Sequence, residues 1–360
     1  MDNVNSALTV NPGIEQPPLV DTASLQRFLA RRRKIMTAAE YVDGILQGNS
    51  AILSQAITLV ESSLPEHSLI AQEIIELCTP HSGNSIRIGI TGVPGAGKST
   101  FIEALGGYLT SKGLLLGVLA IDPSSERSKG SILGDKTRME ALSADKNAFI
   151  RPSPSSGSLG GVARKTRETV FLCEAAGYNV IFIETVGVGQ SETAVKSMTD
   201  FFLLLQIAGA GDELQGIKRG IMEMADLITV NKADGANFEK AQLAKAQYQS
   251  ALHLFPKPPS GWEPKSTISS AITLMGIEDI WNTIKDFERI TKENGYFELQ
   301  RRQQARYWMN ETIRNSLINN FYNNPEIEAI LPEYEQKITD GKMNSFAAAS
   351  ILLNKYFKNT

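Results

Sequence analysis

The sequence predicts an α/β protein in which a mainly parallel, doubly wound sheet is flanked by helices, with a helical segment before it and a helical extension after it. Three observations carry this prediction. A complete phosphate-binding loop lies between an apolar run and a helical pattern, short apolar runs alternate with helical segments, and polar motifs directly follow several of these runs. Ligands of such sheets bind at the carboxyl ends of the strands, which is where all of the motifs fall.

The phosphate-binding loop runs from Gly92 to Ser99 and matches the P-loop pattern G-x-x-x-x-G-K-[ST]. The apolar run 86–90 before it is typical of a buried strand, and apolar residues recur at helical spacing after it. Backbone N–H groups and the helix N-terminus would wrap a polyphosphate, with Lys98 at the β- and γ-phosphates and Ser99 on Mg²⁺. The expected phosphate-binding residues are Gly92, Val93, Pro94, Gly95, Ala96, Gly97, Lys98, Ser99 and Thr100.

The alternation of apolar and helical patterns gives the expected order of elements. Candidate strands cover residues 87–91, 115–122, 148–151, 180–184, 201–206, 227–231 and 266–269. Helices are expected at the C-terminal end over residues 296–322, 326–338 and 345–357. We expect a disordered arm, an N-terminal helical segment, a nucleotide-binding domain and a C-terminal helical extension, over residues 1–20, 21–84, 85–290 and 291–360.

Composition narrows the classes of function. The chain of 360 residues has a net charge of −3 and a pI near 5.8, which does not favour nucleic acid as a partner. Two cysteines cannot form a disulfide framework, and three scattered histidines match no metal-ligand spacing. No apolar run is long enough to span a membrane and the first twenty residues do not resemble a signal peptide, so we expect a cytoplasmic protein without a membrane partner.

An acidic residue ends the candidate strand 180–184. Glu184 stands where most P-loop enzymes carry an aspartate that holds Mg²⁺ through a water, and Gly187 would offer a backbone N–H to the γ-phosphate. Acids also end strands for structural reasons, but the P-loop upstream in the same sheet favours the functional interpretation. The residue after Gly187 is Val188, which cannot orient water, and Gln190 lies too far along, so unassisted hydrolysis should be slow.

The tetrapeptide Asn231-Lys232-Ala233-Asp234 follows the candidate strand 227–231 and matches the guanine-reading motif N-K-x-D. The Asp234 carboxylate can accept hydrogen bonds from N1–H and the exocyclic amino group of guanine, a donor pair that adenine lacks. The expected base-binding residues are Asn231, Lys232, Asp234, Ser270, Ala271 and Ile272, with backbone donors of Ser270 and Ala271 on the guanine oxygen. The expected nucleotides are GTP and GDP rather than ATP.

Two further aspartates are candidates for holding Mg²⁺ or positioning water. Asp122 ends the second candidate strand, and Asp135 lies in a segment rich in serine and glycine. Ordinary turn and N-cap aspartates are an equally good interpretation of both residues. The expected metal site therefore comprises Ser99 and Glu184, joined by Asp122 and Asp135 in the triphosphate state.

Several long motifs occur in one order: GVPGAGKST, IDPSSERSKGSILGDKTRM, ETVGVGQSE, AGAGDELQGIKRGIMEMAD and NKAD. Together they resemble the MeaB family of GTPases, which is close to the methylmalonic aciduria type A protein and whose members have also been called ArgK or LAO/AO transport ATPases. The resemblance is strong over residues 38–295 and looser in the helical tail.

The resemblance implies a GTP-hydrolysing G-protein chaperone that helps an adenosylcobalamin-dependent acyl-CoA mutase with cofactor loading and protection. It also implies a homodimer formed partly through the C-terminal helices. A third switch would match residues 208–220, in which Asp212, Gln215 and Lys218 move toward the nucleotide. Lys218 thereby becomes a catalytic candidate beside Lys98, Asp122, Asp135, Glu184 and Gly187.

Two other functions stay open. One is a GTP-dependent scaffold, because slow hydrolysis and scaffolding look alike in sequence. The other is a transport-linked NTPase or kinase, as the ArgK name suggests, although N-K-x-D argues against ATP chemistry. A nickel-delivery GTPase would need a cluster of Cys and His that the sequence lacks.

Overall fold

The computed structural model describes residues 36–62, 64–121, 139–152, 159–185, 191–209 and 219–358. The chain divides into two compact units, residues 1–37 and 38–360, and all elements below belong to the second. The expected arm over residues 1–20 lies outside the described residues.

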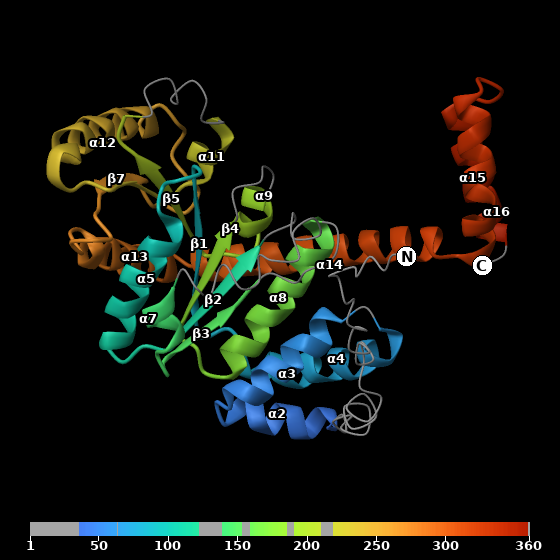
Figure 1. Cartoon of the computed structure of the whole chain (residues 1–360), viewed down its shortest axis with the longest axis horizontal. Coiled ribbons are helices and arrows are strands. Elements are labelled where there is room, and N and C mark those ends of the chain that lie inside the picture. Colours follow the sequence, from blue (N-terminus) through green and yellow to red (C-terminus); the bar gives the residue numbers. More distant parts are fainter. Residues whose placement is uncertain are drawn as a thin grey trace, which may run out of the picture. The chain divides into compact units, whose positions relative to one another are not determined.

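A seven-stranded sheet forms the centre of this unit, with the order β3-β2-β4-β1-β5-β6-β7 (Figure 1). All six neighbouring pairs are parallel. The strands are β1 (Ile86–Gly92), β2 (Leu116–Ile121), β3 (Ala148–Arg151), β4 (Val180–Thr185), β5 (Phe201–Ile207), β6 (Leu227–Asn231) and β7 (Lys265–Ile268). The predicted doubly wound α/β fold is confirmed, and the sheet is wholly rather than mainly parallel.

Helices cover both faces of the sheet, so the central strands are buried on both sides, which explains their continuous apolar runs. On one face, α5 (Lys98–Ser111) and α13 (Ile277–Glu293) pack in a core with Ile88, Phe201 and Phe287. On the other face, α11 (Arg219–Met224) and α12 (Phe238–Leu252) pack around Leu204 and Ile228. Further helices of the sheet unit are α7 (Glu140–Ser143), α8 (Leu159–Ala175) and α9 (Ser191–Lys196), and short 3₁₀ turns cover Thr79–His81 and Gly235–Asn237.

Three N-terminal helices pack against one another and against α8: α2 (Ala38–Leu46), α3 (Ser50–Glu61) and α4 (Pro65–Cys78). The side chain of Asn49 caps α3 by accepting hydrogen bonds from the backbone of Ala51 and Ile52, which fixes the start of that helix.

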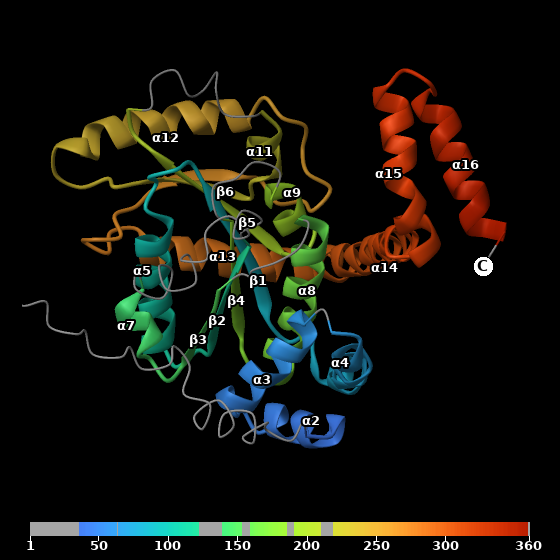
Figure 2. The ribbon, with the colours of Figure 1, turned by 45° about the vertical axis from the view of Figure 1, so that its right-hand side comes forward.

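The C-terminal helices are α14 (Tyr296–Tyr322), α15 (Pro325–Thr339) and α16 (Ser345–Lys358), close to the ranges predicted from sequence. Phe297, Gln304 and Trp308 are the buried residues of α14, so its first part packs against the sheet unit and its second part does not. Helices α15 and α16 pack side by side (Figure 2). Among the residues that the structure describes, no helix combines the length and the apolar character needed to cross a membrane.

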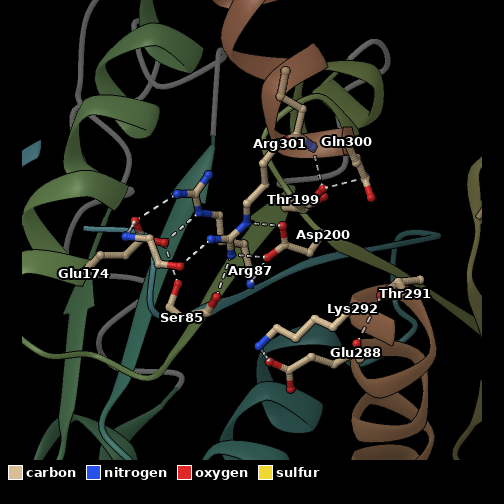
Figure 3. Close-up of polar contacts among 12 residues, drawn as sticks. Ser85, Arg87, Glu174, Thr199, Asp200, Glu288, Thr291, Lys292, Gln300 and Arg301 are labelled. Carbon is tan, nitrogen blue, oxygen red and sulfur yellow. Dashed lines mark hydrogen bonds and ion pairs between the residues drawn. The ribbon is translucent and has the colours of Figure 1, made fainter. Parts of the chain in front are cut away.

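A buried polar network joins α14 to the amino-terminal ends of β1 and β5 (Figure 3). Arg87 donates two hydrogen bonds to Glu174, at 2.7 and 2.8 Å, and Arg301 donates two to Asp200, at 2.8 and 2.7 Å. Burial alone would raise the pKa of Glu174, but the hydrogen bonds and charge of Arg87 and the hydroxyl of Ser85 outweigh burial and hold that pKa below its usual value. The network thus fixes α14 on the sheet through fully paired charges.

Candidate nucleotide site

The predicted phosphate-binding loop connects β1 to α5, with Gly92 as the last residue of the strand and Gly97 as the helix N-cap. A Cβ on Gly92 would lie 2.4 Å from the carbonyl oxygen of Leu205 on the neighbouring strand β5, so only glycine allows this approach. Gly97 has φ +83°, a left-handed conformation that turns the chain into the helix. The loop therefore opens at the carboxyl edge of the sheet, with the N-terminus of α5 facing the same space.

Lys98 is held at the mouth of this loop. Its ammonium group donates a 3.0 Å hydrogen bond to the carbonyl oxygen of Gly92. Burial lowers the pKa of Lys98, and the carboxylates of Glu184 and Glu192 partly offset that effect. A cation fixed at this position can stabilise the negative charge of transferring phosphate oxygens.

Glu184 lies near the end of β4, between β1 and β2, in register with Ile90 and Ala120. Glu184 is buried. The hydroxyl groups of Thr91 and Thr185 form a 2.8 Å hydrogen bond between the ends of β1 and β4. The predicted acid therefore lies at the same sheet edge as the P-loop strand.

The residues present fit a magnesium ion bound together with nucleotide phosphates. The described part of the chain contains no group of three or more His, Cys, Asp or Glu that could hold a metal ion unaided. Mg²⁺ in such sites usually takes one or two protein ligands and completes its shell with phosphate oxygens and water. Ser99, in the first turn of α5, and Glu184 would supply those protein ligands.

Asn231 connects the base-reading motif to the phosphate-binding loop. Its side-chain amide donates a 2.8 Å hydrogen bond to the carbonyl oxygen of Ala96, and its side-chain oxygen accepts one from Ser269 at 3.2 Å. Asn231 is only 2% exposed at the end of β6. The asparagine of the motif thus braces the P-loop, and Lys232 lies alongside Gly97, with its Cε 3.6 Å from the Cβ position of that glycine.

Asp234 is half-buried and accepts a 2.5 Å hydrogen bond from the hydroxyl of Ser270. This bond orients the carboxylate that we expect to read guanine. The backbone N–H of Ser270 donates to the carbonyl oxygen of Met275 at 3.0 Å. The expected donation of the Ser270 and Ala271 backbone to the guanine oxygen stays a prediction, and the side chain of Ile272 is 79% exposed beside them.

Several sequence-predicted residues lie outside the described residues, and the structure says nothing of their positions. They are Asp122, Asp135, Gly187, Val188, Gln190, Asp212, Gln215 and Lys218.

Sequence reasoning assigned no role to Glu192, which the structure brings into the electrostatic environment of Lys98. Glu192 is in the first turn of α9, and α9 packs on β1, where Val195 lies 2.7 Å from the Cβ position of Gly89. The sequence did contain a signal for this residue, because Glu192 is the second acid of the motif ETVGVGQSE and lies at the start of the helix that packs on the P-loop strand.

Comparison with known proteins agrees with this geometry. Residues 53–326 match the family model described as "Methylmalonyl Co-A mutase-associated GTPase MeaB". The chain is 46% identical to "GTPase ArgK" of Escherichia coli K12 over 311 residues, which cover 86% of this chain and 93% of that protein. It is 45% identical to the mouse "Methylmalonic aciduria type A homolog, mitochondrial" over 326 residues, covering 88% and 78% of the two chains.

A solved structure described as a LAO/AO transport system kinase has the same fold. It superposes with a TM-score of 0.69 at 37% identity and covers 90% of this chain and 98% of its own.

Proposed function

The chain belongs to the MeaB family of GTPases, and we propose that it is a chaperone for an adenosylcobalamin-dependent acyl-CoA mutase, which it assists in cofactor loading and protection. The match of residues 53–326 to a family described as methylmalonyl-CoA mutase-associated carries the proposal. The similarity to the mouse methylmalonic aciduria type A homolog also supports it.

In the proposed reaction, each part of the site has a separate task. Backbone N–H groups of the P-loop wrap the phosphates, and Lys98 stabilises the charge that develops on the γ-phosphate oxygens. Asp234, oriented by Ser270, selects guanine. Mg²⁺, held by Ser99 and Glu184 with the phosphates, would neutralise phosphate charge during transfer. The same site binds GDP when the γ-phosphate has left.

We further propose that a second copy of the chain covers the outer part of α14. Beyond Trp308 this helix has no buried residue, yet Met309, Ile313 and Leu317 recur every four residues and are 56%, 51% and 59% exposed. We call these three residues the α14 stripe. Residues four apart lie on one face of a helix, so the stripe is a continuous apolar surface. In a two-fold symmetric dimer the same surface of each copy forms the contact, so the stripes of both copies would be buried.

The chaperone role is tested by measuring GTP hydrolysis with and without a purified adenosylcobalamin-dependent methylmalonyl-CoA mutase. We expect the mutase to accelerate phosphate release at least tenfold, because the partner completes a site that lacks a glutamine after Gly187. Lys98→Ala is the control, since a contaminating GTPase would survive that change. A mutase that neither binds nor changes the rate in either nucleotide state would remove the chaperone role and favour the GTP-dependent scaffold.

The dimer is tested by light scattering on full-length variants. Ile313→Glu with Leu317→Glu should give a monomer that still binds GDP, whereas Asn319→Glu, an exposed change elsewhere on α14, should remain dimeric. A truncated variant should keep α14 through Trp308, its last buried residue. A cut before Arg301 would leave the buried carboxylate of Asp200 without its ion-pair partner. A dimer that survives the double variant would locate the interface elsewhere.

A further inference from the structure

The first part of α14 binds the backbone at the end of α9. The side-chain amide of Gln304 donates to Thr199 O at 2.7 Å and to Lys196 O at 3.5 Å, and the indole N–H of Trp308 donates to Ser197 O at 3.0 Å. Lys196 is the last residue of α9, and Ser197 and Thr199 lie in its connection to β5, so α14 supplies donors to carbonyl groups at and just beyond the end of the helix.

The other end of α9 faces the nucleotide site. Glu192 lies in its first turn and interacts electrostatically with Lys98. Between these two ends, Val195 is fully buried against β1 at Gly89, a position where a larger residue would collide with it. Because α9 is short and packed along its length, a shift at its C-terminal end moves its N-terminal end as well.

Gln304 and Trp308 are both 7% exposed, which makes their donors costly to bury unless they are used. Gln304 directs both of its amide hydrogens to the α9–β5 connection, while its side-chain oxygen has no hydrogen-bond partner. An apolar side chain would avoid that unsatisfied oxygen, so the amide is explained by the donors that it offers to the carbonyl groups.

We propose that Gln304 and Trp308 are positioning residues for GTP hydrolysis: by holding the C-terminal end of α9 they fix Glu192 relative to Lys98. These hydrogen bonds hold α14 at the amino-terminal edge of the sheet, and α9 connects that edge to the carboxyl edge where the nucleotide site lies. The α14 stripe lies on the continuation of the same helix, so binding at the stripe acts on α9 through these two residues.

The test uses full-length variants with phosphate release as the assay. Gln304→Met keeps the length of the side chain and removes its donors, Trp308→Phe removes only the N–H donor, and Gln303→Met is the matched exposed control. We expect kcat to fall about tenfold in the first two variants, with GDP affinity within about twofold of the parent and with the control unchanged. A purely structural role would lower the melting temperature without separating kcat from GDP affinity.

A double-mutant cycle tests whether Gln304 acts through Glu192. Glu192→Gln and Gln304→Met should each lower kcat, and the double variant should be no slower than the slower single variant, because both changes disable one element. Unchanged kcat in both Gln304→Met and Trp308→Phe overturns the proposal, as do multiplicative losses in the double variant. Loss of mutase stimulation alone, at normal unassisted kcat, also overturns it.

Discussion

Replacing Gly92 by alanine should damage the phosphate-binding loop without unfolding the protein. The new Cβ would stand 2.4 Å from Leu205 O and 2.9 Å from Leu205 Cβ. The nearest ordinary contact between carbon and oxygen is about 3.3 Å, so the end of β1 must move by roughly 1 Å. Since Leu205 O belongs to β5 in the centre of the sheet, the end of β1 and the loop after it would yield rather than β5.

A displacement of about 1 Å at a catalytic site costs on the order of 100-fold in rate, which corresponds to about 2.7 kcal/mol of transition-state stabilisation. We therefore expect Gly92→Ala to lower kcat/KM for GTP by about 100-fold, measured by phosphate release. The variant should also bind GDP more weakly in a fluorescence titration.

The matched control is Gly107→Ala, in the exposed interior of α5, where a Cβ would meet no atom within 4 Å. It should stabilise the protein by roughly 0.5–1 kcal/mol, because alanine loses less backbone entropy than glycine in a helix, and leave the kinetics unchanged. Gly92→Ala with kcat/KM within threefold of the parent would show that the close approach to Leu205 is not required for hydrolysis.

Three other changes test separate parts of the structure. Lys98→Ala should abolish measurable hydrolysis with an unchanged circular dichroism spectrum, and normal turnover would remove its catalytic role. Asp234→Asn should weaken GTP binding and favour xanthosine triphosphate in a competition assay. The reason is that the 2-oxo group of xanthine accepts a hydrogen bond where the 2-amino group of guanine donates one. Glu174 has a depressed pKa, so its stabilising effect is present above about pH 4.5 and is lost as pH falls further toward the folded-state pKa. Glu174→Gln should therefore lower the free energy of unfolding in urea at pH 7 and flatten its decline below pH 4.5; a decline as steep as in the parent would assign the acid sensitivity to other carboxylates.

Local patterns in the sequence were enough to predict the strands, the long C-terminal helix and the location of the motifs. These features are local. A strand buried on both faces is a continuous apolar run, as residues 180–183 are, and a P-loop needs its glycines and lysine at fixed spacing. The order of the motifs also placed them at one sheet edge, because parallel strands connected by helices all point their carboxyl ends the same way.

Which of these parts contact one another depends on how the chain folds in three dimensions. Asn231 bonds to Ala96 from 135 positions away, and Arg301 pairs with Asp200 across 101 positions. Such contacts depend on the strand order, in which β1 lies between β4 and β5, and no local pattern encodes that order. Ser270 shows the same dependence, because its hydroxyl bonds to Asp234 from 36 positions away while its backbone N–H bonds to Met275. The local sequence determines which hydrogen-bonding and charged groups each segment carries, whereas the order of the strands in the sheet determines which of these groups meet.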